Sequence, residues 1–125
     1  MSHSYKQLLV WQKSKALAVE IYRATESFPK REWYGLTVQL QRAAVSVSSN
    51  IAEGQGRLTK GEFRNFLGQA RGSLLELETQ LAIARDLGYV GAADHVSLEK
   101  QCDEVRRMLN GLLESLRAPV RTPAP

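Results

Sequence analysis

The sequence has few of the residues on which catalytic and secreted proteins depend. One cysteine, Cys102, and two histidines occur in 125 residues, so no internal disulfide can form and no His or Cys cluster has metal-ligand spacing. Glu76 and Glu78 are two residues apart, and on a helix they would point in different directions rather than form a carboxylate pair. We therefore predict no metal, no cofactor and no enzymatic activity, and we interpret Cys102 as a small buried hydrophobic residue.

Long apolar runs are also missing. No run approaches the roughly 20 residues of a membrane-spanning helix, and the first residues lack the apolar core of a signal peptide. We therefore expect a cytoplasmic protein that does not enter a membrane. The net charge of +4 and the 43% hydrophobic content are ordinary for a globular protein. We predict a single domain over residues 1–117 and a disordered tail over residues 118–125, which contain three of the four prolines.

Sustained strand alternation is absent, and apolar residues instead recur with a period of about 3.6 residues. This period predicts helices over residues 8–28, 36–53 and about 60–87, and a fourth helix with an apolar seam. The seam is formed by Leu98, Cys102, Val105, Leu109, Leu112 and Leu116. Four helices with short connections predict an all-α, antiparallel up-down-up-down four-helix bundle.

The ends of these helices carry local signals. Thr59 followed by Glu62 forms a capping-box pattern at the start of the third helix. Trp33 and Tyr34, in the first connection, are predicted to plug one end of the bundle. The expected stops are Pro29 after the first helix, Gly54 and Gly56 after the second, and Gly88 after the third.

The predicted second helix has two apolar faces. One face carries Leu40, Val47 and Ile51, and the opposite face carries Val38, Val45 and Ala52. A surface helix of a small monomer needs only one apolar stripe, so we interpret Val38, Val45 and Ala52 as an interface with another copy of the protein. Gly68 and Gly72, inside the third helix, would each cost on the order of 1 kcal/mol relative to alanine. Close approach of another helix or of a ligand would compensate for this cost, and tolerated sequence drift is the alternative.

Basic residues form a stripe along one side of the predicted third helix. Lys60, Arg64, Arg71 and Arg85 project within about 60° of one another on an ideal helix. Arg57 lies just before the helix N-terminus, whose free amides attract anions. We predict that Arg57, Lys60, Arg64 and Arg71 bind the phosphate backbone of RNA or DNA. The alternative is an ordinary solvated charged face.

Several segments taken in order resemble a known family, the small bacterial four-helix-bundle proteins named for 23S rRNA intervening sequences. The resemblance covers roughly residues 5–116. It is carried by residues 9–13 (LVWQK), 28–29 (FP), 32–36 (EWYGL), 39–57 with the core NIAEG, 62–67 (EFRNFL) and 72–78 (GSLLELE).

The resemblance implies a ring of subunits, with five as the expected number, and no catalytic residues. It also implies kinship with the accessory protein of diversity-generating retroelements, a pentamer that binds nucleic acid and a reverse transcriptase. We therefore expect a non-enzymatic homopentamer that binds RNA or DNA backbone without strong sequence specificity. The alternative function is a scaffold or adaptor for an unidentified protein partner, with no nucleic-acid binding.

Overall fold

The computed structural model describes residues 4–117, and over this range the protein is all-α. Four α-helices account for most of the chain: α1 (Leu9–Thr25), α2 (Leu36–Gln55), α3 (Lys60–Asp86) and α4 (Ala92–Ser115). Two short 3-10 helices, η1 (Tyr5–Gln7) and η2 (Lys30–Glu32), precede α1 and α2. The prediction of four helices and no strand is therefore confirmed for the described residues. The predicted tail over residues 118–125 lies outside them.

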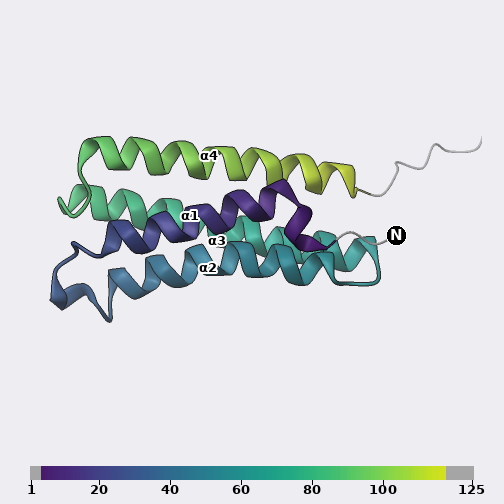
Figure 1. Ribbon diagram of the computed structural model, residues 1–125, viewed down its shortest axis with the longest axis horizontal. Coiled ribbons are helices and arrows are strands. Elements are labelled where there is room, and N and C mark those ends of the chain that lie inside the picture. Colours follow the sequence, from purple (N-terminus) through teal and green to yellow (C-terminus); the bar gives the residue numbers. More distant parts are fainter. Residues whose placement is uncertain (1–3, 118–125) are drawn as a thin grey trace, which may run out of the picture.

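The helices lie alongside one another in a single bundle (Figure 1). α1 contacts α2 and α4, and α3 contacts the same two helices, so α1 lies diagonally across from α3. The apolar stripe of each helix faces the shared core. The largest fully buried side chains are Leu17, Ile21, Leu40, Ile51, Leu67, Leu74, Leu77, Leu81, Leu109, Val47, Val105 and Cys102.

The turn between α2 and α3 differs from the sequence-based expectation. Gly54 does not stop α2, which continues through Gln55 and ends with Gly56 at its C-cap. A Cβ atom on Gly54 would lie 2.8 Å from Cβ of Phe66 and 3.2 Å from the carbonyl oxygen of Phe63. Gly54 is therefore required because α3 approaches the α2 backbone closely at this point.

The start and end of α3 follow the sequence signals. The Thr59 side chain caps the helix by accepting a hydrogen bond from the backbone N–H of Glu62 (3.1 Å). Gly88 follows α3 with φ of +77°, the left-handed conformation that glycine adopts most easily. The Tyr89 N–H then donates to the carbonyl of Ala84 (2.9 Å), so the chain reverses directly into α4.

The seam of α4 is shifted in its last turn. Leu98, Cys102, Val105 and Leu109 are buried as predicted, but Leu113 takes the next buried position. Leu112 and Leu116, which the strict four-three alternation placed on the seam, are partly buried and pack against the edge of the core. The step from Leu109 to Leu113 is four residues where the strict alternation requires three, so the buried stripe departs from a seven-residue repeat in the last turn.

Candidate nucleic-acid interface

A groove between α3 and α4 brings together two of the four predicted phosphate-binding residues. Arg64 and Arg71 both line it, and its volume is about 800 Å³. We call this the α3–α4 groove; its lining consists of Gly61, Arg64, Asn65, Gly68, Gln69, Arg71, Asn110, Leu113 and Glu114. Arg64 and Arg71 are seven residues apart, two turns of α3, so they project in nearly the same direction.

Both arginines are held by neutral acceptors on α4. Nε of Arg64 donates to the backbone carbonyl of Leu113 (3.4 Å), and Nη1 of Arg71 donates to Oδ1 of Asn110 (3.3 Å). Neither guanidinium forms an ion pair with a carboxylate among residues 4–117. Their positive charge is therefore available to an incoming anion, while their side chains are already oriented along the groove.

Small and amide side chains make up much of the remaining lining. Gly68 has no side chain, and a Cβ atom there would meet nothing within 4 Å. The surface beside the two arginines is therefore open. Asn65, Gln69 and Asn110 contribute amide groups, which can donate hydrogen bonds to phosphate oxygens. The acidic lining residue, Glu114, forms an ion pair with Arg117 (3.3 Å). The groove as a whole therefore presents donors and positive charge.

The other two predicted residues lie near the groove but do not line it. Lys60 is exposed at the first residue of α3, one turn before Arg64. Arg57 lies over the ring of Phe66, with its guanidinium 4.6 Å from the ring centroid, and one of its nitrogens is 3.9 Å from a Glu53 carboxylate oxygen. Arg57 therefore belongs to the α2–α3 turn. The nucleic-acid-binding roles of all four residues stay predictions.

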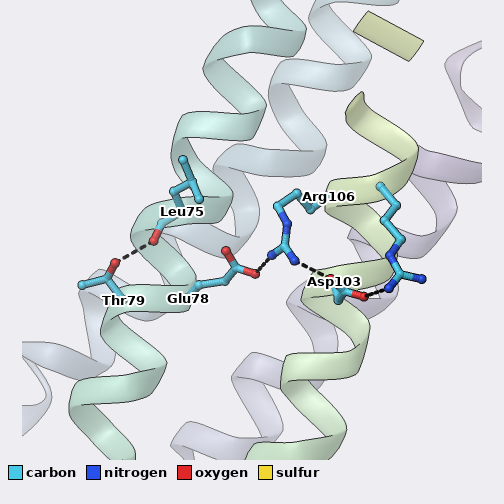
Figure 2. Close-up of polar contacts among 6 residues, drawn as sticks. Leu75, Glu78, Thr79, Asp103 and Arg106 are labelled. Atoms are coloured by element: carbon cyan, nitrogen blue, oxygen red, sulfur yellow. Dashed lines mark hydrogen bonds and ion pairs between the residues drawn. The ribbon is translucent and has the colours of Figure 1, made fainter. Parts of the chain in front are cut away.

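Farther along the same two helices the charges are mixed and paired. Figure 2 shows Glu78 of α3 and Arg106 of α4 pointing toward each other, and Arg106 also pairs with Asp103. Arg107 pairs with Asp103 as well (2.9 Å). The Arg106 side chain is partly buried and links the two helices. Arg85 is directed to the Val90 carbonyl (3.3 Å) at the α3–α4 connection. The carboxylates make this stretch less favourable for a polyanion than the α3–α4 groove.

Cys102 lies beneath that mixed-charge stretch and is inaccessible. It is a free cysteine with an exposed fraction of 0%. Burial, with a smaller contribution from the charge of Glu78, raises the pKa of the Cys102 thiol to about 12. Nucleophilic chemistry requires the thiolate, so this residue is a core residue in this structure. Among the described residues, no group of three or more His, Cys, Asp or Glu side chains could hold a metal ion.

We expect Cys102 to resist thiol reagents in the folded protein. At pH 8 the raised pKa leaves almost no thiolate, and burial blocks access. An Ellman titration should release less than about a tenth of one equivalent per chain within minutes, and a full equivalent in denaturant. Rapid reaction of the native protein would contradict the buried assignment. Loss of nucleic-acid binding in a folded Cys102→Ala variant would contradict the structural role.

Two apolar faces remain open on the outside of the bundle. The α1–α2 face consists of Val19, Tyr22, Val38, Val45 and Ala52. Within it Val45 is 41% exposed, Tyr22 is exposed, and Val38 and Ala52 are partly buried. Val45 lies one turn after Gln41, whose side chain donates to Oγ1 of Thr25 on α1 (3.1 Å). This hydrogen bond shows that α1 and α2 are adjacent along this face.

The α3 face consists of Gly72, Leu75, Thr79 and Ile83. Leu75 and Ile83 are 50% and 47% exposed, and a Cβ atom on Gly72 would meet nothing within 4 Å. Thr79 donates to the backbone carbonyl of Leu75 (2.9 Å), so its hydroxyl is already satisfied. Figure 2 shows Thr79 on the side of α3 turned away from α4. Within residues 4–117 nothing lies within 4 Å of a Cβ atom on Gly68 or Gly72, so packing in this part of the chain does not compensate for either glycine.

The comparisons agree with this architecture. The family model described as "23S rRNA-intervening sequence protein" matches residues 6–111. The chain belongs to this family. A comparison with curated proteins found no match. No helix among residues 4–117 is long and apolar enough to cross a membrane.

A solved structure supports the fold of this family member. It is a protein of unknown function from the S23 ribosomal protein family of Bacteroides thetaiotaomicron VPI-5482, with a TM-score of 0.77 and 22% sequence identity. The match covers 85% of the present chain and 99% of the solved chain. The expected family membership is therefore confirmed. The kinship with the retroelement accessory protein stays a prediction.

Proposed function

We propose that the protein is a non-enzymatic, antiparallel up-down-up-down four-helix bundle that assembles as a homo-oligomeric ring in the cytoplasm and binds the backbone of RNA or DNA. The observation that carries this proposal is the pair of uncompensated arginines, Arg64 and Arg71, in the α3–α4 groove. Five is the subunit number implied by the resemblance to the family.

The chemistry of the groove favours phosphates over bases. Guanidinium groups bind phosphate oxygens through charge-assisted hydrogen bonds, and each neutralised phosphate releases condensed counterions. The described groove has no aromatic side chain against which a base could stack. Contacts of this kind position a nucleic acid without reading its sequence. We therefore propose binding with weak sequence specificity and strong salt dependence.

Assembly would repeat the groove around a ring. The α1–α2 face and the α3 face consist of different residues on different helices. Contact between two different faces is heterologous, and a heterologous contact produces a closed ring when its rotation closes. The side chains of Tyr22 and Val45 project from the first face, and Gly72 leaves space on the second. Because Gly68 lines the α3–α4 groove and lies one turn before Gly72 of the α3 face, assembly would bring the arginines of successive subunits near the same surface.

A salt-dependent titration tests the nucleic-acid proposal. Labelled RNA and DNA are titrated with wild-type protein and with the triple variant Lys60→Gln, Arg64→Gln, Arg71→Gln at about 50 mM and 200 mM salt. We expect the triple variant to bind more weakly. The slope of log affinity against log salt should become shallower by roughly 1 for each phosphate that the variant no longer neutralises. Unlabelled competitors of unrelated sequence should compete equally.

A charge-matched control separates the groove from net charge. Lys13, Arg23 and Arg107 are exposed and paired with carboxylates that do not line the α3–α4 groove, so their triple replacement by Gln removes the same charge elsewhere. This control should retain most of the wild-type affinity. If both triple variants weaken binding equally, the α3–α4 groove is not the binding site. Absence of binding by the wild-type oligomer at about 50 mM salt would contradict nucleic-acid binding.

The second candidate function is a scaffold or adaptor for a protein partner. The exposed apolar residues of the α1–α2 face and the α3 face favour it, because contiguous apolar surface commonly marks protein contacts. Under this alternative the wild-type protein would bind no nucleic acid, and one of the two faces would stay open after self-assembly. Light scattering together with the titration above distinguishes the two functions.

A further inference from the structure

The connection between α1 and α2 presents two aromatic side chains to solvent. Trp33 is 52% exposed and Tyr34 is 95% exposed. The expectation that they plug the end of the bundle is therefore wrong. Phe28, which is buried, fills that position and packs against Tyr89 with ring centroids 5.3 Å apart. Trp33 and Tyr34 lie outside this aromatic pair, so the core does not account for them.

Hydrogen bonds to Glu32 fix the backbone of the α1–α2 connection, although Trp33 and Tyr34 are exposed. Glu32 accepts hydrogen bonds from the hydroxyl of Tyr89 (2.9 Å) and from the backbone N–H of Leu36 (3.3 Å). The first bond joins the α1–α2 connection to the α3–α4 connection, and the second caps the start of α2. A Cβ atom on Gly35 would lie 3.0 Å from Oε1 of Glu32, so glycine leaves room for this cap. The aromatics are therefore presented on a preorganised backbone.

Two cations lie close to aromatic rings at this end of the bundle, one at Trp33 and one at Tyr89. Nζ of Lys30 lies 5.8 Å from the centroid of Trp33, and the guanidinium of Arg31 lies 5.9 Å from the centroid of Tyr89. Neither cation forms an ion pair with a carboxylate in the described part of the chain. We call the group Lys30, Arg31, Trp33 and Tyr34 the aromatic tip.

We infer that the aromatic tip binds unpaired nucleobases of a single-stranded RNA or DNA segment by stacking. Flat aromatic rings beside cations suit this ligand, because bases stack on the rings while the cations attract the adjoining phosphates. Bases within a duplex are already stacked and do not present their faces. The inference rests on the proposed nucleic-acid function and adds a preference for single strands that the α3–α4 groove does not supply.

Binding of a single strand and of a duplex tests the inference. The probes are a labelled oligouridylate of about 15 nucleotides and a blunt RNA duplex of the same length. The variant Trp33→Ala, Tyr34→Ala should bind oligouridylate at least about fivefold more weakly and the duplex within about twofold of wild type. The variant Trp33→Phe should recover much of the affinity, because phenylalanine keeps a stacking surface. The control Val96→Ala removes an equally exposed apolar side chain from α4 and should change neither affinity.

Fluorescence gives a direct readout of stacking at the tip. The chain has two tryptophans, so a Trp11→Phe variant leaves Trp33 as the sole tryptophan, and oligouridylate should quench it. Unchanged fluorescence and an unchanged preference for single strands would overturn the inference while the groove proposal stands. Absence of both single-strand and duplex binding by wild type would overturn both. A smaller assembly in the Trp33→Ala, Tyr34→Ala variant would show that the tip is a subunit interface and would also overturn the inference.

Discussion

Leu109→Ala is expected to lower the free energy of unfolding by about 2–5 kcal/mol. Leu109 is 0% exposed and belongs to the buried stripe of α4. The substitution removes buried methyl groups and leaves a cavity that the neighbouring leucines can fill only in part. Native domains of this size are stable by only about 5–15 kcal/mol, so the decrease is a large fraction of the total.

Urea unfolding followed by circular dichroism measures this effect. Unfolding of an oligomer depends on protein concentration, so wild type and variants must be compared at one protomer concentration. Leu58→Ala is the matched control, because Leu58 is 98% exposed and the same substitution there should change stability by no more than about 0.5 kcal/mol. Similar stability of Leu109→Ala and Leu58→Ala would contradict the assignment of Leu109 to the core.

The helices could be predicted because their signals are local. Apolar periodicity located all four, and the Thr59 cap and the Gly88 stop depend only on residues within one or two turns. The role of Gly54 could not be predicted in this way. A glycine near a helix end resembles a stop signal, whereas its actual requirement is the approach of Phe63 and Phe66 from the next helix. That approach is a property of the packed bundle.

The candidate site was predictable in part for the same reason. The spacing of Arg64 and Arg71 on one helix predicts a shared direction, and both side chains line the groove. The contribution of Asn110 from α4 was missed, because a surface amide carries no sequence signal. The exposure of Trp33 and Tyr34 was also missed. Aromatic side chains are usually buried at least in part, and only the structure shows that Phe28 and Tyr89 occupy the end of the bundle.

The second large effect is expected for Val45→Glu, which should dissociate the assembly. Val45 is 41% exposed in the protomer and lies between the partly buried Val38 and Ala52 on one line along α2. If another subunit covers this line, the substitution places a carboxylate in an apolar interface, where loss of hydration is costly. In the separate protomer the same side chain would remain in water, so the fold should persist.

Light scattering at micromolar concentration measures the mass. Wild type should have several times the 14.0 kDa mass of one chain, and Val45→Glu should approach the mass of one chain with its helical circular dichroism retained. Val96→Glu is the control, because Val96 is 54% exposed on α4, outside the two proposed faces. This control should assemble as wild type does. A monomeric wild-type protein would contradict assembly altogether.

A pair of variants tests the heterologous geometry of the ring. Ile83→Glu places the same charge on the α3 face, where Ile83 is 47% exposed, so it should also dissociate the assembly. Each variant keeps intact the face that is altered in the other. In a heterologous interface one intact α1–α2 face and one intact α3 face can still meet, so a mixture of the two variants should form dimers but no ring. Full assembly of Ile83→Glu alone would show instead that Ile83 lies outside the interface, and the proposed contact between the α1–α2 face and the α3 face would then be wrong.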